Sequence, residues 1–471
     1  MKKNRVLGLI AALLSLVLLV GCGSSGSSNN DDVFNDGAAE ESNVPEGRTQ
    51  ITFWHSWGSD SKAYLQSVVD GFNNSQSTYY VVLQFVGDKN DLHAKLQVTA
   101  EKARPALINT TTEMVGAYLY SDYIVPIYEV AGDSDEDQWY LDRVYDYVVG
   151  TWGDENGNLL GYPMGNSMSG AYFNMDIMEA AGIDPYEDFK SVQDLYDICK
   201  KLVDGNYVEY AIGTEHTGRF LNYSLALQGL QAYNNDSGRT GIPTESYYAT
   251  GDVGKYAELF LQTFVDLQED GLSYSQGSSW GNELLPAYSQ GKIAILTGSL
   301  GGYGRLGRAW KEANPEEEFN TCFVPWVPVT DEVSPKGQPA SGYGFYIIDH
   351  ENDALEQGAW EFIKYITTGE TYAGWCLVTG YLPISDDIYQ TQTYQEYVSD
   401  HEAFGIDYLM EVQRNDDGSV YHPISAIYTQ TSTLAANALT QSLAGGDIKT
   451  ILQTLETDTT DALSMWAMAN S

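Results

Sequence analysis

The apolar and polar positions just after residue 48 follow first a strand pattern and then a helix pattern. Ile51 and Phe53, with the β-branched Thr52 between them, predict a short buried strand. Ser59 and Asp60 can cap a helix that starts near residue 61. Four apolar residues fall at positions i, i+3, i+4 and i+7 of that helix and predict one buried face: Leu65, Val68, Val69 and Phe72.

This alternation of strand and helix continues along the chain. Residues 79–85 predict a second strand, residues 92–103 a second helix and residues 106–109 a third strand. The rhythm is typical of an α/β protein with a mostly parallel sheet, whose ligands bind at the carboxyl ends of the strands. Residues that follow the first and third strands are therefore candidates for a ligand site.

Polar and aromatic residues occupy both of these strand ends. His55, Ser56 and Trp57 follow the first strand, and Thr110 and Thr111 follow the third. The alternative for His55 and Trp57 is ordinary core packing, because large aromatic residues are mostly buried in any fold. The alternative for the threonines is capping of the helical segment that comes next.

The remainder of the chain shows the same patterns without an internal repeat. A short apolar element at 162–165 is followed by small and polar residues, and helices are predicted from near residue 191. Residues 293–296 and 343–348 predict further strands, and the chain reads as helical from residue 354 almost to its end. About 420 residues after the first 47 suffice for two lobes with full cores.

The first 47 residues have the pattern of an export signal followed by a tether. Basic residues precede an apolar run over 6–20, which is shorter than the roughly 20 residues that span a bilayer as a helix. The tetrapeptide LVGC at 19–22 resembles the lipobox of bacterial lipoproteins, which implies a signal peptide over 1–21 and lipidation of Cys22. The alternative is an ordinary secretory signal. Residues 22–47 are small, polar and acidic, and predict a flexible tether at the outer face of the cytoplasmic membrane.

The charge and the cysteines exclude several classes of protein. Lys and Arg total 24 against 65 Asp and Glu, a formal net charge of −41. Such a surface repels phosphate backbones and anionic lipid, so we expect no nucleic-acid partner and no membrane contact beyond the lipid anchor. Cys199, Cys322 and Cys376 have no C-x-x-C spacing, so neither a disulfide framework nor a zinc site is predicted.

Motifs for catalysis are weak or missing. None of the six histidines falls in a metal-ligand spacing such as H-E-x-x-H, and no G-x-S-x-G elbow occurs. Gly302, Gly304 and Gly307 form a G-x-G-x-x-G, but the acidic residues at 316–318 come too early for a dinucleotide site. A secreted glycoside hydrolase stays open as an alternative, because nothing marks out one pair among 65 acidic residues. We expect no catalytic residue, no cofactor and no metal.

Five segments resemble the family 1 extracellular solute-binding proteins of ABC importers. They are ITFWHSW at 51–57, GYPMGNSMSGAYFNMDIMEAAGIDP at 161–185, QGKIAILTGS at 290–299, SGYGFYII at 341–348 and AWEFIKYITTGETYAGWCLVTGYLPIS at 359–385. The last segment is the most specific, because a helix that ends near Trp375 and runs into TGYLP is hard to produce by packing alone. The resemblance covers nearly all of the chain after residue 49.

The resemblance implies a two-lobe periplasmic-binding-protein fold, in which mostly parallel sheets are flanked by helices. Three crossings between the lobes are expected, near 162–165, 294–296 and 342–345. The first lobe then holds 48–161 and 297–342, and the second holds 165–293 and 346–471. A ligand that touches both lobes favours their closed arrangement, which the membrane permease of the importer recognises. We expect the binding protein itself to be a monomer.

The resemblance also implies the class of ligand. Aromatic residues at breaks between elements favour a sugar or oligosaccharide, because flat apolar faces stack on sugar rings. A scarcity of Arg disfavours an anion, but FWHSW, TGYLPIS and Arg305 keep glycerol-3-phosphate or a glycerophosphodiester as the alternative. Trp57 is the strongest stacking candidate. The predicted ligand-binding residues are His55, Ser56, Trp57, Thr110, Thr111, Asn166, Trp280, Ser299, Tyr343 and Tyr381.

Overall fold

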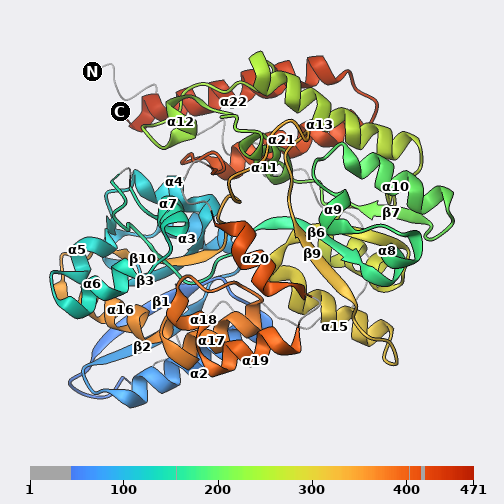
Figure 1. Ribbon diagram of the computed structural model, residues 1–471. Coiled ribbons are helices and arrows are strands. Elements are labelled where there is room, and N and C mark those ends of the chain that lie inside the picture. Colours follow the sequence, from blue (N-terminus) through green and yellow to red (C-terminus); the bar gives the residue numbers. More distant parts are fainter. Residues whose placement is uncertain (1–43, 155, 402–403, 415–419, 471) are drawn as a thin grey trace, which may run out of the picture. The chain divides into compact units, whose positions relative to one another are not determined.

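A computed structural model describes residues 44–154, 156–401, 404–414 and 420–470 (Figure 1). The predicted signal peptide over 1–21, Cys22 and most of the tether over 22–47 lie outside the described residues. The chain divides into two units, Met1–Ser42 and Asn43–Ser471, and the fold below is that of the second unit. Among the described helices, none combines the length and the apolar composition that crossing a membrane requires.

The first sheet has six strands in the order β2-β1-β3-β10-β4, with β5 paired to β10. β1 (Thr49–His55) lies parallel to β2 (Tyr79–Phe85) and to β3 (Leu107–Thr111). β10 (Tyr343–Ile348) is antiparallel to β3, to β4 (Ile124–Val125) and to β5 (Tyr162–Pro163). The prediction of a mostly parallel sheet is wrong at this edge, because β10 enters the sheet on the chain's return from the second one.

The second sheet has four strands in the order β7-β8-β6-β9. β7 (Tyr210–Gly213) is parallel to β8 (Ile293–Ser299), whereas β6 (Ser169–Asn174) is antiparallel to both β8 and β9 (Thr321–Pro325). Successive side chains of β6 alternate between two apolar clusters. Tyr172 enters a cluster that continues into the first sheet, and Ala171 and Phe173 enter a second cluster on the opposite face.

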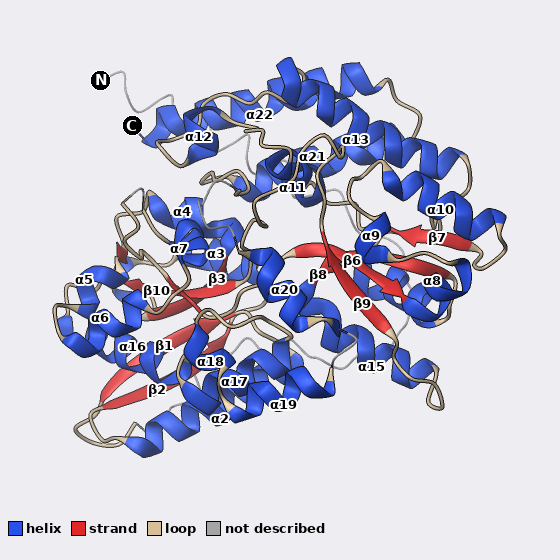
Figure 2. Cartoon of the chain, in the orientation of Figure 1, coloured by secondary structure: helices blue, strands red, loops and turns tan. Residues whose placement is uncertain are grey.

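Helices lie on the outer sides of both groups of strands (Figure 2). The first lobe, defined as the first sheet and the helices of its chain segments, contains α2 (Ser59–Ser75), α3 (Lys89–Val98), α4 (Val115–Leu119), α5 (Ile127–Ala131), α6 (Asp135–Asp142), α7 (Asp146–Trp152), α16 (Asp353–Ile366), α17 (Gly369–Thr379), α18 (Asp386–Tyr389) and α19 (Gln392–Asp400). Two 3₁₀ turns, η1 (Glu101–Ala103) and η2 (Thr112–Met114), flank β3.

The second lobe is the second sheet with the helices of its own segments. These are α8 (Met175–Ala181), α9 (Pro185–Asp188), α10 (Asp194–Asp204), α11 (Arg219–Leu227), α12 (Asn234–Gly238), α13 (Gly251–Glu269), the π-helical turn η3 (Trp280–Leu284), α14 (Leu285–Ser289), the 3₁₀ turn η4 (Leu300–Gly302), α15 (Tyr303–Ala313), α21 (Tyr428–Leu443) and α22 (Ile448–Asn470). α20 (Ile406–Gln413) packs near β9 and contributes to the apolar cluster that both lobes share.

The chain passes between the two sheets at residues 164–168, between β5 and β6, and at residues 326–342, between β9 and β10. A third passage lies between α19 and α21, a stretch that the structure describes in part. Two predicted crossings adjoin the first two passages. The crossing predicted at 294–296 is wrong, because these residues form the fully buried centre of β8 and pair with β6.

The predicted division into lobes needs two corrections. Residues 297–342 were assigned to the first lobe, but β9 pairs with β6 and α15 packs against α14. Residues 346–471 were assigned to the second lobe, but α16 packs on β1 and β10, and α17 packs on α2. The amphipathic pattern of a helix reveals that one face is buried but does not reveal which sheet covers it.

Candidate functional site

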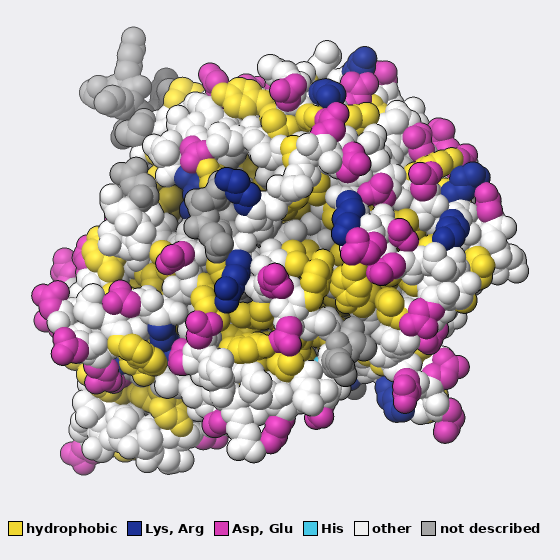
Figure 3. Space-filling model, viewed as in Figure 1, with side chains coloured by type: hydrophobic (Ala, Val, Ile, Leu, Met, Phe, Trp, Pro, Cys, Tyr) yellow, Lys and Arg dark blue, Asp and Glu magenta, His cyan; other side chains and the backbone are white. Residues whose placement is uncertain are grey.

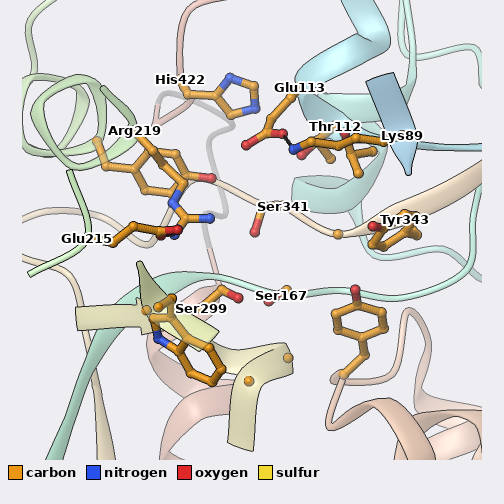
Figure 4. A pocket seen from close by; sticks show the side chains of 18 of the residues that line it. Lys89, Thr112, Glu113, Ser167, Glu215, Arg219, Ser299, Ser341, Tyr343 and His422 are labelled. Atoms are coloured by element: carbon orange, nitrogen blue, oxygen red, sulfur yellow. Dashed lines mark hydrogen bonds and ion pairs between the residues drawn. The ribbon is translucent and has the colours of Figure 1, made fainter. Parts of the chain in front are cut away.

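A cavity of about 560 Å³ lies between the two lobes. Its walls come from both sheets and from the two passages between them (Figure 4). The lining residues are Lys89, Thr111, Thr112, Glu113, Ser167, Glu215, Arg219, Tyr223, Ser279, Trp280, Gly281, Gly298, Ser299, Gly301, Gly302, Arg305, Ser341, Gly342, Tyr343, Tyr381, His422 and Tyr428. A cavity of this size matches the roughly 300–1,000 Å³ of small-molecule sites.

The first lobe contributes an ion pair and a hydroxyl group at the ends of its elements. Lys89 is the first residue of α3, whose amino end is capped by the Asp88 side chain. The Lys89 ammonium contacts the carboxylate of Glu113, which lies on the turn after β3. Thr111, at the end of β3, is buried, and its Oγ1 has no hydrogen-bond partner among the described residues. The carboxyl end of a central strand thus presents polar groups to the cavity, as expected for an α/β sheet.

The second lobe contributes another ion pair on the opposite wall. Arg219 begins α11, and its Nη2 lies 3.4 Å from Oε2 of Glu215 (Figure 4). The Nε of Arg219 is buried and has no hydrogen-bond partner in the part of the chain that the structure describes, so this guanidinium retains a donor there. Lys89 and Arg219 are therefore each paired with a carboxylate of their own lobe.

Burial lowers the pKa of two side chains in the cavity wall, Lys89 and His422. Burial, and next the positive charge of Arg219, lower the pKa of Lys89 to about 8, while Asp88 and Glu215 oppose this. Burial lowers the pKa of His422 to about 4, so its imidazole is neutral at pH 7. The ring stacks on Tyr223 at 5.8 Å, and its Nδ1 lies 3.0 Å from the Pro423 carbonyl oxygen. His422 therefore contributes a neutral aromatic ring to the cavity wall at pH 7.

Three half-buried aromatic rings line the other end of the cavity. The indole Nε1 of Trp280 donates to the carbonyl oxygen of Thr297 at 3.1 Å, which fixes the plane of the ring. Tyr343 and Tyr381 lie with their ring centroids 6.1 Å apart. Burial raises the pKa of Tyr343 to about 12, so its hydroxyl keeps its proton at neutral pH and can donate a hydrogen bond.

The glycines of the stretch 298–302 make room for these rings. A Cβ on Gly298 would lie 2.9 Å from Nε1 of Trp280, and one on Gly302 would lie 2.9 Å from the same indole. A Cβ on Gly301 would lie 2.7 Å from the ring of Tyr381. The glycine-rich sequence that superficially matches a dinucleotide motif therefore serves aromatic packing at the cavity.

Five of the ten predicted ligand residues line the cavity: Thr111, Trp280, Ser299, Tyr343 and Tyr381. The other five do not: His55, Ser56, Trp57, Thr110 and Asn166. Asn166 is buried in the passage, where Nδ2 donates to Tyr147 at 3.2 Å and Oδ1 accepts from Gln413 at 2.7 Å. The backbone N–H of Ser56 donates to Oδ1 of Asn109 at 2.8 Å. These residues support the cavity from behind.

Trp57 and His55 belong to the core of the first lobe. Trp57 is 5% exposed and packs on Trp375 at 4.6 Å and on Tyr343 at 5.6 Å. His55 is 1% exposed, and burial followed by the charge of Lys62 lowers its pKa to about 4. Trp57 thus lies directly behind Tyr343, which is the ring that reaches the cavity.

Several residues of the site have no recognisable pattern in the sequence. The two ion pairs, the passage residues Ser167 and Ser341, and the stack of Tyr223 and His422 were not predicted. These groups become neighbours only through the passages between the lobes. Among the described residues, no group of three or more His, Cys, Asp or Glu side chains is arranged to hold a metal ion.

Comparison with known proteins shows that the chain is similar to bacterial solute-binding proteins. Residues 67–402 match the model of a family described as bacterial extracellular solute-binding protein. The sn-glycerol-3-phosphate-binding periplasmic protein UgpB of Yersinia pseudotuberculosis is 26% identical over 354 residues, which cover 74% of this chain and 77% of that protein. UgpB of Rhizobium meliloti is 23% identical over 350 residues, covering 73% and 76% of the two chains.

Solved structures match over most of the chain. The cyclic alpha-maltosyl-1,6-maltose binding protein of Arthrobacter globiformis has a TM-score of 0.68 at 19% identity and covers 89% of this chain and all of its own. The sugar-binding protein MalE of Xanthomonas citri has a TM-score of 0.71 at 13% identity, with coverage of 90% and 100%. These likenesses confirm the predicted α/β two-lobe fold.

Proposed function

We propose that this chain, which belongs to the family of bacterial extracellular solute-binding proteins, captures a sugar or oligosaccharide between its lobes for an ABC importer. The observation that supports this most is the composition of the cavity walls. Hydroxyl groups, two ion pairs and several flat aromatic rings surround one space of about 560 Å³. Sugar rings present hydroxyl edges and apolar faces, and both kinds of partner are available here.

The ligand is held by groups from both lobes. Lys89, Glu113 and Thr111 come from the first lobe, and Glu215 and Arg219 come from the second. A ligand that contacts both sets gains more contacts when the lobes are closed, so binding favours closure. Small-angle X-ray scattering tests this step. A ligand confirmed by calorimetry should reduce the radius of gyration, and an unchanged radius would exclude closure by this ligand.

A glycerol phosphate is the second candidate ligand. It is favoured by Arg305 and Lys89 at the cavity and by the names of the UgpB relatives. The two carboxylates in the same walls, Glu113 and Glu215, weaken this candidate because they repel a doubly charged phosphate.

The family places the protein outside the cytoplasmic membrane. Within that location, the LVGC tetrapeptide at 19–22 supports a lipid anchor on Cys22, with the folded lobes acting as a monomer. Labelling of cells with a palmitate analogue should modify the wild-type chain and not a Cys22→Ala variant. Labelling that persists in the variant would exclude Cys22 as the anchor.

A thermal-shift screen followed by calorimetry tests the proposed function. A ligand that binds only the folded chain raises the melting temperature, by an amount that grows with its concentration relative to Kd. We expect a mono- or oligosaccharide to raise it and to be recovered intact after prolonged incubation. Chromatographic detection of cleavage products would favour the hydrolase alternative. A screen in which no sugar, polyol or glycerol phosphate binds would refute the proposed function.

A further inference from the structure

The side chains that line the cavity have a small excess of positive charge, whereas the chain as a whole has a large excess of acid. Figure 3 shows many carboxylates and few basic side chains on the visible face, in keeping with the net charge of −41. Three cations and two carboxylates line the cavity, and His422 is neutral. Lys89 and Arg219 each have a carboxylate partner. Arg305 is the remaining cation, and no described carboxylate lies within ion-pair distance of it.

The position of the Arg305 guanidinium depends on Trp280 and Gly281. Its guanidinium carbon lies 5.5 Å from the centre of the Trp280 ring. A Cβ on Gly281 would come within 2.5 Å of its Nη2, so the absence of a side chain at 281 leaves space for the guanidinium. The contact with an aromatic face holds the cation at the cavity edge.

The amino end of a helix lies at the same place. Arg305 is in the first turn of α15, an 11-residue helix preceded by η4, and Gly301 and Gly302 of η4 line the cavity. Backbone N–H groups and the helix dipole make such an end favourable for an anion. Arg is scarce in the sequence, which disfavours an anion. At this edge of the cavity, however, Arg305 and the amino end of α15 lie together.

A buried hydroxyl at this helix end has no hydrogen-bond partner among the residues that the structure describes. Ser167 is 3% exposed, lines the cavity, and its Oγ makes no hydrogen bond in the described chain. It lies beside the start of η4, because the next residue, Met168, accepts a hydrogen bond from Leu300 N–H at 3.0 Å. Leaving a buried hydroxyl without a hydrogen bond is unfavourable. Such an atom in a cavity wall indicates a polar group of the ligand.

From these three features we propose that the captured sugar or polyol carries an acidic group, which binds between Arg305, Ser167 and the amino end of η4 and α15. This inference rests on the proposed function, since it concerns a ligand of the same cavity. The hydroxylated remainder of the ligand lies toward Lys89, Glu113, Glu215 and Arg219, whose paired charges suit neutral hydroxyl groups. The acidic group is either a carboxylate of an acidic sugar or a phosphate of a glycerol phosphate.

Calorimetry with matched neutral and acidic compounds tests the inference. The pairs are galactose with galacturonate, a neutral disaccharide with digalacturonate, and glycerol with sn-glycerol-3-phosphate. At least one acid should bind more than ten times as tightly as its neutral partner, and raising the salt concentration should weaken it because the charges are partly exposed. Tight binding of a uronate identifies a carboxylate as the group, and tight binding of the glycerol phosphate identifies a phosphate.

Three variants assign the effect to this subsite. Arg305→Gln should weaken the acid roughly 10- to 100-fold, the range for loss of a charge-assisted hydrogen bond, and leave neutral compounds unchanged. Ser167→Ala should weaken the acid several-fold without lowering the melting temperature, because it removes an unpaired buried hydroxyl. Lys311→Gln is the control, since Lys311 lies on the same helix and donates to the Pro315 carbonyl oxygen rather than lining the cavity.

The possible results separate the inference from the proposed function. If neutral sugars bind as tightly as acids, or Arg305→Gln leaves the affinity of the acid unchanged, the inference is overturned and the proposed function stands. If neither acids nor neutral compounds bind, both are overturned. Selective loss of the acid in Arg305→Gln, with no loss in Lys311→Gln, supports the inference.

Discussion

Replacing two tryptophans separately tests whether the cavity is the ligand site. Trp280 lines the cavity and is half-buried, whereas Trp57 is 5% exposed and lies behind Tyr343. Trp280→Ala should therefore weaken ligand binding with little loss of stability. Trp57→Ala should destabilise the fold first and affect binding only through Tyr343.

The size of each effect follows from the contacts. A sugar face that buries about 50 Å² of the Trp280 ring gains about 1.2 kcal/mol at about 25 cal/mol per Å². A well-oriented ring contact adds about 0.5–1.5 kcal/mol. Trp280→Ala should then raise Kd roughly 20- to 100-fold. Trp57→Ala removes a buried indole, which costs about 3–5 kcal/mol of the free energy of unfolding. Over roughly 430 residues this lowers Tm by about 3–6 °C.

Differential scanning calorimetry of each variant, with and without the ligand found by screening, measures both quantities. Trp280→Phe and Trp57→Phe are the matched controls, because each retains a ring and should show a smaller effect of the same kind. Unchanged affinity in Trp280→Ala would refute the assignment of the cavity as the ligand site. Unchanged Tm together with lost affinity in Trp57→Ala would refute its assignment to the core.

Three further predictions concern single positions. Gly301→Ala should weaken ligand binding by displacing Tyr381. Gly304→Ala should not, because its Cβ would lie 3.7 Å from Nη1 of Arg308, an ordinary contact distance. Calorimetry measures the affinity of both variants, and resistance to trypsin shows whether they stay folded. Burial lowers the pKa of His422 from 6.5 to about 4, so the unfolded chain binds the extra proton and the free energy of unfolding falls as the pH drops from 6.5 to 4. In urea unfolding, His422→Phe should lose up to about 3 kcal/mol less than the wild type over this pH interval. Burial also lowers the pKa of Lys89, so wild-type stability relative to Lys89→Met should rise between pH 8 and 10.5, and an equal pH profile of the two in thermal unfolding would contradict this.

Local patterns predicted the elements well. The strand predicted at 79–85 matches β2, and the one predicted at 343–348 matches β10, because apolar and β-branched residues bounded by turns specify a strand within a short window. The helix predicted near residue 61 begins at Ser59. These assignments need only information that is close in the sequence.

The division into lobes could not be predicted from such windows. α16 and α17 follow β10 directly and pack on the first sheet, while α21 and α22, which follow in turn, pack with α11 and α13 of the second lobe. Each of the four buries apolar side chains, and a run of apolar residues in a helix does not indicate which lobe covers it. Their placement depends on the third passage of the chain between the lobes, which has no local signature.

The sequence predicts residues of the candidate site where an aromatic residue stands at a break between elements. It does not predict the charged residues that meet across the lobes. Trp280, Tyr343 and Tyr381 stand at such breaks. Lys89 and Glu113 are 24 positions apart, and each opens or follows an ordinary element. In a chain with 65 acidic residues, no sequence feature distinguishes Glu113 or Glu215 from carboxylates that face water.

The two ion pairs reduce the electrostatic repulsion between the lobes when they close on a ligand. Because Lys89 is neutralised by Glu113 within the first lobe and Arg219 by Glu215 within the second, the lobes approach each other without two bare positive charges meeting. Some repulsion remains, since Arg219 helps to lower the pKa of Lys89. A ligand with hydroxyl groups between the two pairs accepts from the cations and donates to the carboxylates, which removes the remaining repulsion and favours closure. Arg305 has no carboxylate partner among the described residues, which is why we propose that an acidic group of the ligand binds there.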